Sequence, residues 1–143
     1  MCVVCFFLSA CSTDKKGFEI GQKIPHEAVK NAETGYFMIH TGSLTKLYKM
    51  RKEDVDYYVA FNPQMEVIYL ETSDRNFSTP EHLTMKATYA DARKLAGSGP
   101  TIVPKWANFI SLPSGWNVAF QYTGSADTAI TGTTPVKMFF KKK

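Results

Sequence analysis

The sequence predicts an α+β fold, in which an antiparallel sheet carries its helices on one face. Six β-prone runs are bounded by turn residues, and two segments carry helix start signals, in the order helix then three strands, twice over. This order predicts two repeats, 18–73 and 78–140, and the run Tyr57–Phe61 (YYVAF) is echoed by Trp116–Phe120 (WNVAF). The length of 143 residues, with 44% apolar residues, suits one domain with its own core.

In the first half, a helix is expected over 25–32, where Pro25 suits a first helical position and Gly35 is placed to end it. Three strands should follow. The first leaves a helix open as an alternative, because its leucines and tyrosine also have helical spacing. A short connection at 63–65 joins the other two as a hairpin. The expected strands are Leu44–Met50, Tyr57–Asn62 and Val67–Thr72.

In the second half, Thr88-x-x-Asp91 has the spacing of a capping box, with Asp in place of the usual Glu. It predicts a helix over Tyr89–Ala96 that ends at Gly97. The turn residues at 113–115 separate two of the next three strands, and the Gly-, Ser- and Thr-rich stretch 123–135 is expected to be an exposed loop. The expected strands are Asn108–Leu112, Trp116–Tyr122 and Val136–Phe140.

The N-terminal segment carries the most specific motif of the chain. The run Leu8-Ser9-Ala10-Cys11 follows the apolar stretch Cys2–Leu8, and it resembles the lipobox of bacterial lipoproteins. The resemblance implies that residues 1–10 are a signal peptide, that the Cys11 sulfur carries a diacylglycerol, and that residues 11–17 tether the lipid to one domain over 18–143. The alternative is a buried N-terminal strand, because Cys2–Leu8 is rich in β-formers.

The same resemblance predicts where the protein lies. By the Gram-negative sorting rule, Ser12 after the lipidated cysteine indicates the outer membrane, with the domain in the periplasm. The apolar stretch is too short for a transmembrane helix, which needs about 20 residues. The three cysteines, Cys2, Cys5 and Cys11, all lie in this segment, so the mature domain should contain no disulfide.

The sequence offers no recognisable catalytic constellation. His26, His40 and His82 lack the spacing of a zinc site, and no Gly-x-Ser-x-Gly motif occurs. We therefore expect neither an enzyme nor a bound metal or cofactor. The net charge of +4 includes the three lysines at 141–143, and no basic stripe interleaved with aromatics predicts nucleic-acid binding.

Aromatic residues make up 13% of the chain and alternate along the expected strands, so most of them should fill the core. Trp106 and Trp116 lie next to turn signals, and we predict that they are exposed. Exposed tryptophans dominate protein-binding hot spots, which makes these two the candidate partner-binding residues.

The order of elements also loosely resembles the two-repeat α+β domains of β-lactamase inhibitor proteins and of small outer-membrane assembly lipoproteins. With the Cys11 lipidation, this predicts a lipid-anchored cell-envelope protein that acts as a binding, inhibitory or exclusion module towards another envelope protein. Two alternatives stay open: a structural or assembly lipoprotein of the outer membrane, and a small envelope hydrolase whose site is assembled from dispersed residues.

Overall fold

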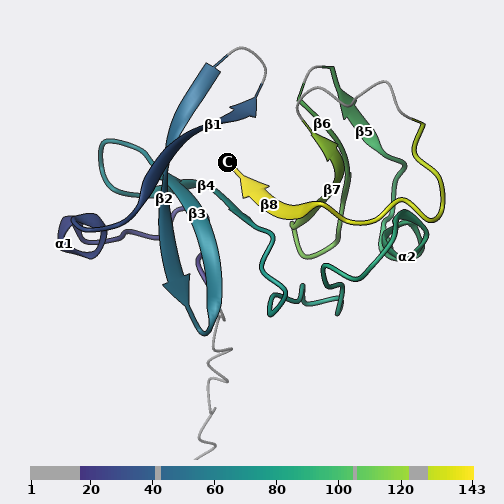
Figure 1. The fold of residues 1–143 in the computed structure, drawn as a ribbon, viewed down its shortest axis with the longest axis horizontal. Helices are drawn as coiled ribbons and strands as arrows, with labels where there is room; N and C mark the ends of the chain where they lie inside the picture. The colour runs from purple at the N-terminus through teal and green to yellow at the C-terminus, as the bar shows by residue number, and fades with distance from the viewer. Residues whose placement is uncertain (1–16, 41–42, 105, 123–128) are drawn as a thin grey trace, which may run out of the picture.

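The computed structural model describes residues 17–40, 43–104, 106–122 and 129–143. The predicted signal peptide, Cys11 and most of the tether lie outside these residues. The described chain forms one curled sheet, a half-barrel of eight antiparallel strands in the order β1-β2-β3-β4-β8-β7-β6-β5 (Figure 1). The strands are β1 (Thr34–His40), β2 (Ser43–Lys52), β3 (Val55–Phe61), β4 (Val67–Thr72), β5 (Thr101–Val103), β6 (Ala107–Ser111), β7 (Asn117–Tyr122) and β8 (Met138–Lys142).

The fold is mostly antiparallel β, so the predicted α+β arrangement with helices packed on a sheet face is wrong. The two helices, α1 (His26–Val29) and α2 (Tyr89–Leu95), have only four and seven residues and are too short to cover a face. The predicted set of three strands after each helix is also wrong, because four strands follow each of them. The two strands that the sequence did not predict are β1 and β5, which form the two edges of the sheet.

Gly35 explains the error at β1. The sequence predicts that this residue ends a helix, but it lies inside the strand, opposite Leu47 of β2. A glycine weakens a strand because it has no side chain to pack. Here the ring of Phe37 fills that space, since a Cβ built at Gly35 would lie 2.6 Å from Cε2 of Phe37.

The predicted capping box is present at α2. The carboxylate of Asp91 accepts hydrogen bonds from the backbone N–H and the hydroxyl of Thr88, both at 2.9 Å. An aspartate therefore performs the role of the usual glutamate at this helix N-terminus.

The centre of the sheet is the pair β4 and β8, which joins the first four strands to the last four. Two of the C-terminal lysines belong to β8 and do not form a solvated tail. Lys141 pairs with Glu19 at 3.2 Å and lies over the ring of Trp116, while Lys142 lies over the ring of Trp106.

Side chains pack on both faces of the sheet, in two clusters. Because successive residues of a strand point to opposite faces, Phe139 belongs to one cluster and Phe140 to the other. The first cluster includes Val29 of α1 and Ala92 of α2, together with parts of the irregular segments 18–24 and 73–88. The second lies on the inside of the curl, and its largest members are Tyr69, Trp106, Phe109 and Phe140.

Candidate functional site

Trp106 is buried, with 1% of its surface exposed, so the predicted exposure of this residue is wrong. Its indole N–H donates a hydrogen bond to the carbonyl of Met38 in β1 at 2.9 Å, and its ring lies 5.3 Å from that of Phe140. The turn signals beside Trp106 were interpreted as exposure. The curl of the sheet instead brings this turn near edge strand β1, and the large ring fills the space inside the curl.

Trp116 is buried as well, with 6% of its surface exposed. Its ring lies 4.6 Å from that of Phe77, in the segment between β4 and α2, and 5.1 Å from the ammonium of Lys141. The predicted exposure is wrong because this long connection packs over the start of β7. In this fold, neither tryptophan lies on an open surface that a partner could contact.

Cys11 lies outside the described residues, so its lipidation stays a prediction. The first described residue, Gly17, lies at the end of the sheet where β2 turns into β3. Lys52 donates a hydrogen bond to the Gly17 carbonyl at 2.6 Å, and the rings of Phe18 and Tyr57 meet edge to face at 5.4 Å. The described chain therefore begins beside the β2–β3 turn, whose strands are labelled in Figure 1.

Exposed apolar side chains gather at the opposite end of β2. Tyr36 is 68% exposed and Leu44 is 66% exposed, and they lie on neighbouring strands β1 and β2. Lys46 is directly opposite Tyr36, and its ammonium lies 5.0 Å from the ring centre of Tyr48. No carboxylate of the described chain forms an ion pair with Lys46. We call Tyr36, Leu44 and Lys46 the hairpin surface.

The hairpin surface was missed because β1 was not predicted. The signal was present, since residues 36–39 form the apolar run Tyr-Phe-Met-Ile, which is typical of a strand. Exposed aromatic side chains such as Tyr36 are enriched at protein-binding surfaces and among their hot spots. Ile102 of β5, which is 62% exposed, is a comparable apolar residue on the other edge strand.

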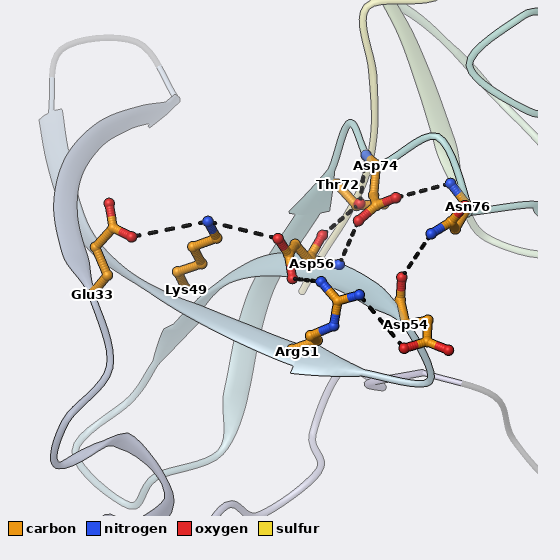
Figure 2. A network of polar contacts seen from close by, with 8 residues as sticks. All are labelled: Glu33, Lys49, Arg51, Asp54, Asp56, Thr72, Asp74 and Asn76. Atoms are coloured by element: carbon orange, nitrogen blue, oxygen red, sulfur yellow. Dashed lines mark hydrogen bonds and ion pairs between the residues drawn. The ribbon is translucent and has the colours of Figure 1, made fainter.

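The charged cluster around the β2–β3 turn satisfies its own charges (Figure 2). Asp56 pairs with Arg51 at 3.0 Å and with Lys49 at 3.6 Å, and Lys49 extends the network to Glu33 at 3.9 Å. These are solvent-exposed pairs, which contribute little stability individually. Each charged side chain of the network drawn in Figure 2 has an oppositely charged or hydrogen-bonded partner, so the network gives no indication of a ligand.

Asp74 fixes the start of the connection that follows β4. Its carboxylate accepts backbone hydrogen bonds from Asn76 at 2.8 Å and from Asp56 at 2.9 Å (Figure 2). These two bonds, from Asn76 and then Asp56, lower the pKa of Asp74 below its ordinary value of 3.8. The carboxylate form is therefore favoured by the folded state.

Asp74→Asn is expected to lower the free energy of unfolding at pH 7 by about 1 kcal/mol, because charge-assisted hydrogen bonds become neutral ones at a partly exposed site. A lowered pKa contributes stability above the ordinary carboxyl pKa, and this contribution is lost as pH falls through the folded value. The difference from wild type should therefore shrink below about pH 4. Urea titrations from pH 3 to pH 7 measure it.

Asp54→Asn, in the neighbouring β2–β3 turn, is the matched control, because Asp54 is exposed and its carboxylate only pairs with Arg51 at 3.5 Å. We expect this variant to unfold like wild type. Equal losses in both variants, or a loss for Asp74→Asn that persists at pH 3, would contradict the role given to Asp74.

The hollows of the described surface do not bring catalytic groups together. A shallow hollow of about 440 Å³ contains His26, but its other lining residues include no acid. His40 contacts Ser43 at 2.8 Å, and His82 lies in the connection before α2. In the described ranges, no three His, Cys, Asp or Glu side chains are grouped as metal ligands would be.

A second hollow, of about 270 Å³, is lined by Tyr57, Glu53 and Phe77 among others. Burial, together with the negative charge of Glu53, raises the pKa of Tyr57 to about 12. The phenol therefore stays protonated at physiological pH and is a poor general base. This geometry offers no support for the predicted alternative of a small hydrolase.

Within the described ranges, no helix has both the length and the apolar character needed to cross a bilayer. Comparisons with protein-family models, with curated proteins and with solved structures found no match to this chain.

Proposed function

We propose that this protein is a lipid-anchored component of the bacterial cell envelope that binds another envelope protein through the hairpin surface. The observation that carries the proposal is the pair of exposed apolar side chains, Tyr36 and Leu44, beside Lys46, which forms no ion pair with a described residue. Single exposed apolar residues are normal, and we base the proposal on the grouping of two of them on neighbouring strands.

The position of this surface suits a protein that is anchored by Cys11. The tether from Cys11 to Gly17 spans at most about 20 Å. Gly17 is held by Lys52 at the last residue of β2, whereas Leu44 lies at the start of the same strand. A strand of ten residues is about 30 Å long. The hairpin surface therefore lies at the far end from the lipid, where a partner in the aqueous space can reach it.

The test is a pull-down from a membrane fraction with the intact lipoprotein and two variants. Tyr36→Ser/Leu44→Ser removes the apolar groups of the hairpin surface, and Ile102→Ser is the control at the other edge strand. We expect wild type and the control to recover one stoichiometric partner. The double variant should recover at least about tenfold less of that partner, as expected for the loss of hot-spot residues.

Equal recovery by the double variant would show that the partner binds elsewhere, and the absence of any stoichiometric partner with wild type would contradict the binding function. A Cys11→Ser chain tests the anchor separately. It should lose palmitate labelling and leave the membrane fraction, and a labelled, membrane-bound Cys11→Ser protein would show that the lipobox interpretation is wrong.

A further inference from the structure

The outer edge of β1 exposes backbone hydrogen-bonding groups. Glu33, just before the strand, accepts a hydrogen bond at 2.8 Å from the backbone N–H of Lys49, which lies opposite it when the register of β1 and β2 is continued by one residue. In an antiparallel pair, hydrogen-bonded and non-hydrogen-bonded positions alternate. Gly35 and Phe37 therefore direct their backbone groups to β2, while Thr34, Tyr36 and Met38 direct theirs outwards.

The outward carbonyl of Met38 already has a hydrogen-bond donor within the same chain. It accepts the hydrogen bond from the Trp106 indole at 2.9 Å, which confirms the direction deduced from the register. The groups open for pairing are therefore the N–H and C=O of Thr34 and Tyr36, together with the N–H of Met38. Thr34 and Tyr36 are both exposed, and β1 pairs with no strand other than β2 in the described sheet.

The two edges of the sheet differ in their protection. The opposite edge strand, β5, has three residues and lies between Pro100 and Pro104. Short edge strands and prolines prevent pairing with another chain. In contrast, β1 has seven residues and contains no proline and no Lys, Arg, Asp or Glu. Among the residues that the structure describes, none pairs with the outer edge of β1 at Thr34 and Tyr36, so this edge can accept a further strand.

We propose that β1 pairs antiparallel with β1 of a second copy of this chain, about a two-fold axis at Gly35. Thr34 of one copy then lies opposite Tyr36 of the other, and each of these residues directs both backbone groups to the other copy. The open groups of Thr34 and Tyr36 in the two copies match, as a two-fold interface requires. The pairing makes four hydrogen bonds, the number that two hydrogen-bonded pairs supply.

Gly35 suits the axis position. Gly35 of one copy lies opposite Gly35 of the other in a non-hydrogen-bonded pair, where the two Cα atoms approach to about 4.5 Å. The ring of Phe37 lies against Gly35 and is 39% exposed, so the two copies place their Phe37 rings beside the axis on one face. Glu33 lies opposite Phe37 of the second copy, so no like charges are opposed.

The position of Trp106 selects this register. An axis at Tyr36 would place Thr34 opposite Met38, whose outer side holds the Trp106 indole. An axis at Gly35 pairs only open groups, and the residue that it places opposite Met38 is Ala32, which lies outside β1 and donates its backbone N–H to Val29 in the turn after α1. The pairing would also bring the two hairpin surfaces side by side, so the dimer would double the surface proposed to bind an envelope partner.

The register is testable by disulfide cross-linking of the purified full-length chain in which Cys2, Cys5 and Cys11 are replaced by Ser. Two single variants of it, Thr34→Cys and Tyr36→Cys, are mixed and oxidised mildly. Directly opposite residues have Cα atoms about 5.5 Å apart, within disulfide range, whereas Tyr36 lies too far from Tyr36 of the second copy. We expect the mixture to yield mainly Thr34–Tyr36 heterodimers, and an Ile102→Cys chain to yield none with either variant.

Sedimentation equilibrium tests the association itself. The chain should show a concentration-dependent mass approaching the dimer, and Tyr36→Pro should stay monomeric, because the lost N–H points outwards and edge positions tolerate proline. A strictly monomeric chain, or homodimers of Tyr36→Cys that exceed the mixed cross-link, would overturn the proposal. These measurements contain no envelope component, so their failure leaves the binding of an envelope protein untouched.

Discussion

Trp106→Ala is expected to lower the free energy of unfolding by about 3–5 kcal/mol, the loss typical of a buried tryptophan in a core. Trp106 is 1% exposed, and its ring contacts those of Phe109 and Phe140 at 6.0 and 5.3 Å. Its indole N–H also connects the β5–β6 turn to edge strand β1 through Met38. The substitution would leave a cavity inside the curl and separate the two ends of the sheet. Urea unfolding followed by far-UV circular dichroism measures the loss.

Trp106→Phe is the control that separates packing from the hydrogen bond. It keeps an aromatic ring but cannot donate to the Met38 carbonyl, so a loss of about 1–2 kcal/mol is expected from the hydrogen bond, in addition to the cost of the smaller ring. If the free energy of unfolding of Trp106→Ala is within about 1 kcal/mol of the wild-type value, the ring neither fills the interior of the curl nor holds β1 to the β5–β6 turn.

Removal of residues 138–143 is expected to abolish cooperative folding. These residues include all of β8, which pairs with β4 on one side and β7 on the other. Phe139 and Phe140 are fully buried on opposite faces of the sheet. Each buried phenylalanine is typically worth about 3–5 kcal/mol, and a whole domain is stable by only about 5–15 kcal/mol. Loss of both, together with two rows of strand pairing, exceeds that margin.

The control for this truncation removes Lys143 alone. Lys143 is exposed, and its backbone N–H donates to the Ile68 carbonyl at 3.0 Å, so we expect a loss of at most about 1.5 kcal/mol. Circular dichroism and the presence of a cooperative urea transition distinguish the two chains. A cooperative transition in the chain that lacks 138–143 would show that β8 is dispensable for joining the two halves of the sheet.

The strands with strong local signals were predicted well. The expected strand Val67–Thr72 is β4 with the same bounds, and Asn108–Leu112 differs from β6 by one residue at each end. The capping box at Thr88 and Asp91 also placed the start of α2 correctly. In these segments, apolar alternation, turn residues and capping chemistry all act between neighbours in the chain, so the sequence alone contains the information.

The edge strands were not predicted, because their local signals conflict with their structure. Gly35 indicates the end of a helix, and β5 is a three-residue segment between two prolines. Pairing with β2 and β6 overrides those preferences, since strand propensity depends on the neighbours that a strand packs against. The sequence prediction therefore lacks one strand in each half. Without β1 it also contains neither the hairpin surface nor the open strand edge.

The sequence by itself determined most of the strands, the position of α2 and the motif at Cys11, whose lipidation stays a prediction. The tertiary structure decided which aromatic side chains are buried. Trp106 and Met38 are 68 positions apart, and only the curl of the sheet brings them together. Contacts between residues so distant depend on the arrangement of the whole chain, and no local pattern records them. For that reason the candidate binding surface consists of the exposed Tyr36 and Leu44, and not of the buried tryptophans.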